Sequence, residues 1–454
     1  MKNELFQPDF FDEKTNENLL TKDKHTNEGI GKPRLLQVNR SQIEFRIQSL
    51  DQLIPKNHKA RLVWKFVDNL DLSHYLKNIK SVEGCPGRSA INPQILVSLW
   101  LYATIEGIAS AHQLGRYCRE HSAFAWICGD VKVGRKTLSN FRAEQGELLN
   151  ELLAQSVAIM LDKELISLEE IGQDGMRVRA SAGSSSFRTL KTLKERYKAA
   201  KKYITELQKE MADNSGKAVA RREQIKLEKA KQQKEKIQSA IEEMKVFEKE
   251  LNEGRKNHRK KTLNKEEKQK LRTSITDPKA RKMKMGDGGF RPAYNVQFAT
   301  TVKGQAIVSV GITHKGSDYN QLESMFMKLK KCYNVIPKSW LADNGFNNHD
   351  EIETLESEGC ETYIPLKKAK NIDPHKPRKG ESEALAKRRL RMGTDDAKEK
   401  YKLRAQTSEF PNAEARNRGM QRFLVNGIQK SLNVSLIFAL THNLLRMSSL
   451  SGLI

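Results

Sequence analysis

Two aspartates lie in segments that the sequence predicts to be buried strands. Asp343 follows three apolar residues in "SWLADNGF" (339–346), and Asp174 lies within "EEIGQDGMRVRASAG" (169–183). Acidic residues are depleted inside strands, so Asp174 needs a reason to be there. If these two strands are neighbours, both carboxylates can project from one edge of a sheet. Such oxygens suit Mg²⁺, which completes its shell with water and substrate phosphate.

Each aspartate also has an ordinary structural interpretation, because Asp-Asn-Gly is common turn chemistry. Gly175, directly after Asp174, leaves the backbone open to a large ligand. Two Mg²⁺ or Mn²⁺ ions about 3.5–4 Å apart support in-line attack on a phosphodiester. The metal interpretation therefore requires further acids and a sheet that brings Asp174 and Asp343 together.

Three other acids are interpreted as structural. Asp318 precedes Gln321 by three residues, which is the spacing of a helix capping box. Asp277 precedes a proline and Asp287 lies in Gly-Asp-Gly-Gly, and both are turn settings.

The elements that must position the two aspartates alternate between strands and helices. The β-rich segments are 169–183, 294–301, 305–314, 339–343 and 361–367, and helices are expected at 318–333 and 349–359. Three strands, a helix, a strand, a helix and a strand describe a mixed α/β sheet.

A basic segment interrupts this order between the first and second strands. Residues 191–270 contain 25 Lys/Arg and 14 Asp/Glu. Apolar residues recur there at three- and four-residue spacing, which predicts two antiparallel helices with a coiled-coil seam. The seam comprises Leu190, Leu193, Tyr197, Ala200, Ile204, Leu207 and Met211, then Ile237, Ile241, Met244, Phe247 and Leu251. The hairpin is interpreted either as a phosphate-binding surface or as a solvated spacer.

Residues 41–165 predict a separate domain of short helices, preceded by a flexible arm at 1–40. In 92–107, Asn92 is a candidate N-cap and Pro93 occupies the first helical position. Within 134–161, a group of polar residues could form one exposed surface near a helix start, as a helix-turn-helix DNA reader requires. That group comprises Thr137, Ser139, Asn140 and Arg142.

The charge of the whole chain points to a polyanionic partner. The 454 residues carry 81 Lys/Arg against 56 Asp/Glu, a net charge of +25. Nucleic acid is the commonest polyanion in a cell. The apolar segments are too short to span a bilayer, and the acidic N-terminus does not resemble a secretory signal. Five cysteines without a Cys-x-x-Cys pair suit a reducing cytoplasm. These features predict a cytoplasmic, nucleoid-associated protein that does not bind membranes.

Asp174, Asp343 and the segment 401–447, beginning "YKLRAQTSEFPNAEARNRGMQRF", together resemble bacterial insertion-sequence transposases with an acidic-triad (DDE), ribonuclease-H-like core. The segments "TDPKARKMKMGDGGFRPAYNVQFAT" (276–300) and "LADNGF" are similar to runs typical of that family, and 55–142 resembles its helical N-terminal domain. The resemblance covers about residues 45–450, apart from the hairpin. It implies an α/β catalytic domain at 166–190 and 272–454, interrupted by a helical insertion at 191–271.

The resemblance also implies residue roles. Asp174, Asp343 and Glu409 would be the catalytic metal ligands. Glu409 belongs to a tyrosine, arginine, glutamate and basic-residue signature, which here comprises Tyr401, Arg404, Glu409 and Arg416. Four residues separate Arg404 from Glu409 where the family has three, so Glu414 remains a rival. Tyr401, Arg404 and Arg416 would contact DNA.

The implied reaction is DNA transposition with Mg²⁺ or Mn²⁺, as two ions. Water hydrolyses the 3′ end of the element, and the freed 3′-OH attacks target DNA. The expected partners are duplex DNA, as terminal inverted repeats and as target, and a second copy of the chain in the DNA complex. Two alternatives remain: a metal-dependent nuclease that never joins ends, and a non-catalytic DNA-binding protein.

Overall fold

The computed structural model describes residues 47–77, 79, 81–82, 89–213, 217–257, 260–367 and 373–452. The arm predicted for 1–40 lies outside these residues. By its contacts the chain divides into residues 1–48 and 49–454. The second unit contains both the sheet and the helices that precede it.

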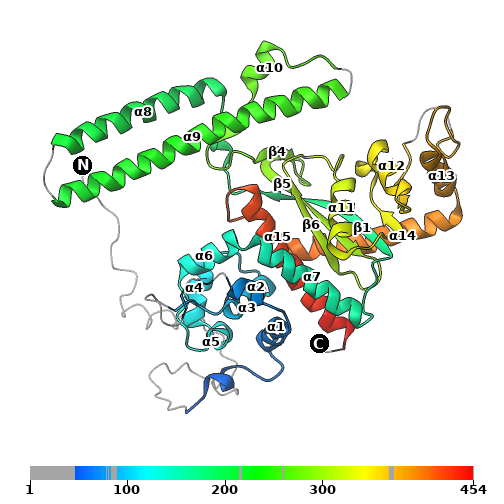
Figure 1. Ribbon diagram of the computed structural model, residues 1–454, viewed down its shortest axis with the longest axis horizontal. Helices are drawn as coiled ribbons and strands as arrows, with labels where there is room; N and C mark the ends of the chain where they lie inside the picture. The colour runs from blue at the N-terminus through cyan, green and yellow to red at the C-terminus, as the bar shows by residue number, and fades with distance from the viewer. Residues whose placement is uncertain are drawn as a thin grey trace, which may run out of the picture. The chain divides into compact units, whose positions relative to one another are not determined.

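A six-stranded mixed sheet forms the centre of this unit (Figure 1). Its central strand β1 (Glu170–Arg179) pairs antiparallel with β5 (Phe290–Thr301) and parallel with β7 (Ser339–Leu341). Beyond β7 lies the parallel strand β8 (Glu361–Tyr363). Two strands, β4 (Arg281–Lys284) and β6 (Ile307–Thr313), pair antiparallel with successive parts of the other edge of β5. The predicted mixed α/β architecture is confirmed.

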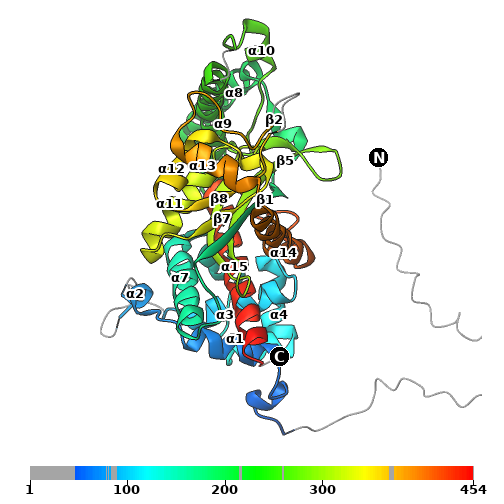
Figure 2. The ribbon, with the colours of Figure 1, turned by 90° about the vertical axis from the view of Figure 1, so that its right-hand side faces the viewer.

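Helices cover both faces of the sheet (Figure 2). On one face lie α11 (Leu322–Tyr333) and α12 (His349–Ser357), where Phe326 of α11 packs edge-on against Trp340 of β7. On the other face lie α14 (Asp395–Asn417) and α15 (Ile428–Leu450), where Phe438 of α15 packs on Phe298 of β5. The helix α13 (Glu383–Met392) packs beside α12 and β8. Side chains therefore alternate along β1 between an α11 face and an α14 face.

A helical layer precedes the sheet and shares its core. Its helices are α1 (Lys59–Asp68), α2 (Ser73–Leu76), α3 (Pro93–Ile105), α4 (Ala111–Glu120), α5 (Ser122–Cys128), α6 (Arg135–Glu144) and α7 (Gly146–Asp162). As expected, Asn92 caps α3 by accepting a hydrogen bond from the Gln94 amide at 2.9 Å. The mostly buried α15 packs against α3, α6 and α7, which joins the layer to the sheet. None of the described helices is long and apolar enough to cross a membrane.

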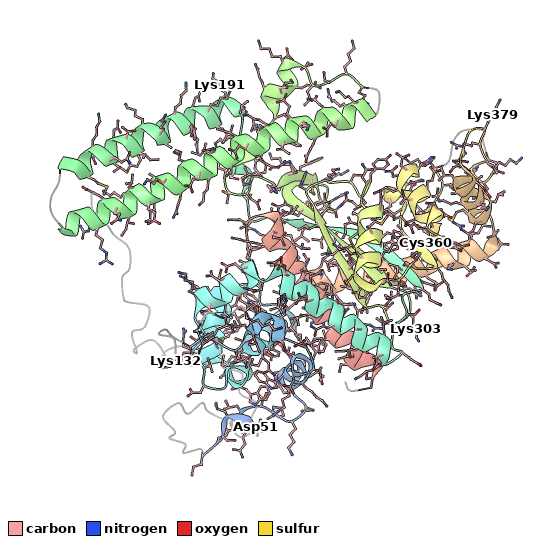
Figure 3. The ribbon with its side chains drawn as sticks, in the orientation of Figure 1. Asp51, Lys132, Lys191, Lys303, Cys360 and Lys379 are labelled. Carbon is pink, nitrogen blue, oxygen red and sulfur yellow. The ribbon has the colours of Figure 1, made fainter. Side chains whose placement is uncertain are left out.

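The basic segment forms a helical hairpin between β1 and β4 (Figures 1 and 3). The hairpin consists of α8 (Leu190–Asp213) and α9 (Lys217–Asn257), which lie side by side around a seam that includes Leu193, Ile237 and Met244. Long side chains extend outward along both helices, including that of Lys191 at the start of α8 (Figure 3). A short helix, α10 (Lys265–Lys270), leads back to the core.

The base of the hairpin is attached to the core by polar contacts as well as by the seam. The Arg281 guanidinium of β4 lies 2.6 Å from Glu243 and 4.3 Å from the ring centroid of Phe247, both on α9. Nearby, His314 pairs with Glu250 at 3.0 Å. Arg281 and Glu243 are almost fully buried, so this ion pair is screened little by solvent. These contacts fix the direction in which the proximal part of the hairpin leaves the sheet.

Candidate active site

Asp174 and Asp343 lie at the same level of two neighbouring parallel strands. The parallel register pairs Gly172 of β1 with Leu341 of β7, and each aspartate follows two residues later. Strand β7 has ended by then, and Asp343 caps a 3-10 turn at Asn344–Phe346 by accepting a hydrogen bond from the Gly345 amide at 2.7 Å. Asp343 is thus a turn residue and also a carboxylate at a strand end.

The Asp174 carboxylate is held on two sides. Its Oδ1 accepts a hydrogen bond from the Gly175 amide at 2.8 Å, and its Oδ2 accepts one from Nδ2 of Asn412 at 3.0 Å. The pKa of Asp174 is raised to about 6, mainly by burial and also by the negative charges of Asp343 and Asp318. The Gly175 hydrogen bond and the Arg404 charge oppose these effects. Asp174 therefore lies in an acidic environment that a cation would relieve.

Asp318 is the third acid of this environment, and its interpretation as a helix cap is wrong. Helix α11 begins at Leu322 with Gln321 as its N-cap, and no side chain caps it. The Oδ1 of Asp318 instead accepts hydrogen bonds from Nδ2 of Asn295 and Nε2 of Gln297, each at 2.7 Å. The two donors lie on β5, more than twenty residues before Asp318. The spacing of residues around Asp318 therefore could not have predicted these hydrogen bonds.

Asp318 also explains Gly175. A Cβ atom at Gly175 would lie 2.0 Å from Oδ1 of Asp318 and 2.5 Å from Nε2 of Gln297. The space beside this glycine is therefore filled by the chain's own carboxylate and amides. The expectation that Gly175 leaves the backbone open to a large ligand is wrong, because the α11 face of the strand is occupied at this point.

Helix α14 crosses β1 on the Asp174 face and carries the predicted signature residues. A Cβ at Gly172 would lie 2.8 Å from Oγ of Ser408, so the glycine permits close approach of this helix. The Arg404 guanidinium carbon lies 5.9 Å from the ring centroid of Tyr401, and Arg404 pairs with Glu409 at 3.5 Å. The charges of Asp343 and Asp174 act on Tyr401, which places this part of α14 beside the aspartates.

The two candidate third acids are both engaged by other groups. The Glu409 side chain is 65% exposed, and its described ion pair is the one with Arg404. Glu414 lies 2.7 Å from Nδ1 of His442 and 3.3 Å from Arg418. Burial raises the pKa of Glu414, but the hydrogen bond and charge of His442, with Arg418, hold it below its usual value.

The buried His442 makes Glu414 a structural residue. Its Nε2 lies 2.7 Å from the Gln305 carbonyl oxygen, so both ring nitrogens face acceptor oxygens. The structure therefore brings together Asp174, Asp343, Tyr401 and Arg404, and it brings neither glutamate into hydrogen-bonding contact with the aspartates. Arg416, the last signature residue, is exposed on α14.

The donor set suits a hard cation, although no preformed cage is present. In the described part of the chain, no group of three or more His, Cys, Asp or Glu residues is arranged to hold a metal ion. Mg²⁺, however, commonly binds through one or two carboxylates plus water and substrate phosphate. Two further oxygens near Asp174 lack partners: Asn412 Oδ1 and Ser408 Oγ are buried without a hydrogen bond. Such atoms are costly unless water or an ion satisfies them.

The predicted DNA-reading residues lie on α6, but not all on its exposed side. Thr137 and Asn140 are exposed, together with Arg135 and Lys136. Arg142 is 5% exposed and lies 4.3 Å from the ring centroid of Trp100, and it donates to the Ala109 carbonyl at 2.5 Å. Burial lowers the pKa of Arg142 to about 10. The expected common surface therefore excludes Arg142, because its guanidinium packs inside the helical layer.

A basic groove separates α6 from the start of α4. Its volume is about 440 Å³, and it is lined by Ser110, Ala111, His112, Arg135, Lys136, Ser139, Asn140, Arg142 and Leu424. Arg135 and Lys136 supply exposed cations, and Ser139 and Asn140 supply neutral donors. Such a mixture is suited to phosphate oxygens.

Among the comparisons with known proteins, a family model matches most of the helical layer. No curated protein and no solved structure matched the chain. Residues 48–144, which begin before α1 and run to the end of α6, match the family model described as "Transposase domain (DUF772)". This match supports a transposase family for the chain.

Proposed function

We propose that this protein is a DNA transposase that cleaves the ends of an insertion sequence and joins the 3′-OH ends to target DNA. One observation carries the proposal: Asp174 and Asp343 follow paired positions of neighbouring parallel strands, beside the arginine of α14. The transposase-domain match in the preceding helices supports the same function independently. The resemblance of the sequence to acidic-triad transposases connects the two.

We assign the sheet to the ribonuclease-H-like class. The supporting features are an antiparallel group of β6, β5 and β1, followed by the parallel strands β7 and β8. Helices lie on both faces, and the first acid is on the central strand. The proposed active site lies at Asp174 within β1 and just beyond the end of β7, as the resemblance implies.

Asp174 and Asp343 would hold Mg²⁺ or Mn²⁺, as two ions, with the substrate phosphate as a shared ligand. When bound, the ions supply activation of the attacking oxygen and stabilisation of the leaving oxygen. Asn412 fixes the Asp174 carboxylate from the α14 side by donating to its Oδ2. Arg404 would bind the phosphate, because a guanidinium can donate two parallel hydrogen bonds to its oxygens.

Arg404 also links phosphate binding to the proposed third acid. Glu409 pairs with Arg404 at 3.5 Å through a carboxylate that is mostly exposed. A phosphate on Arg404 would compete with this pair and release Glu409. The released side chain would then be free to act as the third acid when substrate is bound.

The basic surfaces would hold the duplex. We propose that α6 reads the terminal inverted repeats through Thr137 and Asn140, with phosphate contacts from Arg135, Lys136 and the hairpin. Tyr401 and Arg416 would contact DNA near the cleavage site. The complex would contain two copies of the chain, one for each end of the element.

The test uses the full-length protein and a DNA fragment that carries both ends of the element encoding it. With Mg²⁺, the expected products are nicks at the element's ends and joined products with a target plasmid. Asp174→Asn and Asp343→Asn should yield neither product. Cleavage without joining would identify a nuclease, and specific binding without cleavage would identify a DNA-binding protein. Equal cleavage by wild type and both variants would refute this active site.

A further inference from the structure

Strands β4 and β5 continue past the end of β1 and are joined by an exposed loop (Figure 2). Phe290, where this loop meets β5, is 66% exposed. We infer that Phe290 is a wedge that inserts between base pairs of the bound duplex, while Lys282 and Lys284 hold the adjacent phosphates. The inference rests on the proposed function and adds to it a contact that distorts the DNA.

Phe290 lies on the face of the sheet from which Asp174 projects. Asp174 is paired with Phe298 in the antiparallel register, so both side chains leave the same face. Side chains alternate along a strand, which places Tyr294 and Phe290 on that face too. Tyr294 packs there against Phe423, which follows α14. The eight residues from Phe298 to Phe290 span about 27 Å of strand, the length of about eight base pairs.

Exposed cations surround Phe290 on this face. Lys284 is its direct partner on β4, and Lys282 precedes Lys284 by two residues, so all three side chains share the face. Both lysines are exposed, and neither forms an ion pair with another described residue. Arg422, which bridges to Arg179 at the end of β1, adds an exposed cation between the hairpin and Asp174. Lysine is depleted at protein–protein interfaces, so this surface fits a polyanion better than a protein partner.

The β4–β5 hairpin is anchored, as a wedge requires. The Arg177 guanidinium of β1 donates to the Lys284 carbonyl at 2.9 Å and to the Gly316 carbonyl at 2.8 Å. Within the loop, Arg291 donates to Asp287 at 2.7 Å. Single exposed apolar side chains are common on proteins. Phe290 differs because it stands on an anchored hairpin, beside exposed lysines, as do the apolar wedges of proteins that bend DNA.

Two substitutions at Phe290 separate the wedge from other roles. Phe290→Ala removes the apolar side chain, whereas Phe290→Leu keeps one of a type that also serves as a wedge. Both variants should fold, because the side chain is mostly exposed. The matched control is Ile336→Ala, which truncates a 41% exposed apolar residue between α11 and β7. Lys282→Gln combined with Lys284→Gln tests the phosphate contacts.

The experiment mixes each full-length protein, in EDTA, with duplexes that carry one end of the element. Each duplex has 2-aminopurine, whose fluorescence rises when it unstacks, at one position on either side of the cleavage site. Wild type should give a several-fold rise at one or two adjacent positions about eight base pairs from that site. Phe290→Ala should lose this rise and keep the wild-type thermal midpoint, whereas Phe290→Leu and Ile336→Ala should retain the rise. The double lysine variant should flatten the salt dependence of binding by about 0.9 per lost contact.

The outcomes separate this inference from the proposed function. If Phe290→Ala unstacks the same bases as wild type, or if wild type cleaves the element's end without unstacking any base, the wedge is refuted and the proposed function stands. If Phe290→Ala keeps the fluorescence rise but loses self-association in analytical ultracentrifugation, Phe290 contacts a second copy of the chain instead of DNA. If wild type neither binds nor cleaves the element's end, the proposed function and the wedge both fail.

Discussion

Asn412 donates a hydrogen bond to Oδ2 of Asp174 at 3.0 Å across 238 residues of sequence. The bond joins helix α14 to the central strand at the residue on which the proposed chemistry depends. Gly172, two residues before Asp174, permits this approach because Ser408 occupies the space a side chain would need. The close approach of α14 at Gly172 and the hydrogen bond from Asn412 together fix the Asp174 carboxylate against this helix.

Asp174→Asn should abolish cleavage and stabilise the metal-free protein. The folded-state pKa of Asp174 is raised to about 6, so the folded protein holds this proton more tightly than the unfolded chain. The free energy of unfolding therefore falls as pH rises from about 4 to 6, and the loss persists above that range. At pH 8 in EDTA, the substitution should raise it by on the order of 1–3 kcal/mol. Urea unfolding monitored by circular dichroism measures this, and a destabilised variant would contradict the prediction.

Cleavage by wild type should decline as pH falls through about 6, because protonation of Asp174 removes a metal ligand. Since metal and proton compete for the same oxygens, higher Mg²⁺ concentrations should move the midpoint to lower pH. Single-turnover cleavage rates between pH 5 and 8, at two Mg²⁺ concentrations, test this. A midpoint that does not respond to Mg²⁺ would assign the titration to another group.

Glu409→Gln and Glu414→Gln should fail in different ways. Glu409→Gln should abolish cleavage with Mg²⁺ and Mn²⁺ and leave the thermal midpoint nearly unchanged, because the side chain is mostly exposed. Glu414→Gln should retain cleavage when folded but lose about 1–3 kcal/mol of stability, because it weakens a charged hydrogen bond to the buried His442. Cleavage assays paired with thermal unfolding distinguish them. The reverse pattern would make Glu414 the third acid.

Shortening the hairpin should reduce the salt dependence of DNA binding. Replacing residues 201–236 with a short glycine turn removes eleven Lys/Arg and six Asp/Glu, while the seam around Leu193 and Met244 remains. For each phosphate that the shortened protein no longer neutralises, the slope of log affinity against log salt concentration should flatten by about 0.9. Fluorescence anisotropy between 50 and 300 mM salt measures the slope.

A matched control keeps the hairpin's length. Lys226→Gln combined with Lys229→Gln removes two exposed charges from α9 without shortening it. This variant should reproduce part of the change in slope if charge is the cause. Identical slopes in wild type and in both variants would make the hairpin a spacer.

Asn140→Ala and Arg142→Met should separate DNA contact from stability. Asn140 is exposed on α6, so its loss should weaken binding to the terminal repeats and leave unfolding unchanged. Arg142 packs on Trp100 and donates to Ala109, so its replacement should lower the free energy of unfolding by about 1–3 kcal/mol. Binding and unfolding measurements on both variants test this. Equal effects on binding, without destabilisation, would restore Arg142 to the exposed surface.

β-rich composition predicted five of the six strands of the sheet, and the short edge strand β4 was missed. The order of strands and helices, the interruption by a basic hairpin and the N-cap at Asn92 could all be predicted from neighbouring residues. Asp174 could be selected because acids are depleted inside strands, and Asp343 because it ends an apolar segment. Their matched register follows from the parallel pairing of β1 with β7.

The remaining features depend on contacts that no local pattern contains. The spacing of Asp318 and Gln321 matched a helix capping box. Only the folded structure shows that Asp318 instead accepts hydrogen bonds from Asn295 and Gln297 of β5. In the sequence, the only sign of this contact was that Asn295 and Gln297 occupy alternate positions of a strand that is otherwise mostly apolar. The sequence predicted Arg142 on an exposed helix surface. The structure shows its guanidinium buried against the ring of Trp100.

The hairpin leaves the core after Arg188 and returns at Thr273, and these two residues face each other across the short strands β2 (Phe187–Arg188) and β3 (Thr273–Ser274). Neighbouring strands lie about 4.8 Å apart, so the chain segment between Arg188 and Thr273 starts and ends at nearly the same place. The part of the hairpin beyond the contacts of Glu243, Phe247 and Glu250 can therefore change in length without shifting β1 or β5. Evolution can thus adjust how far this protein would reach along the proposed DNA partner while the acids around Asp174 keep their positions.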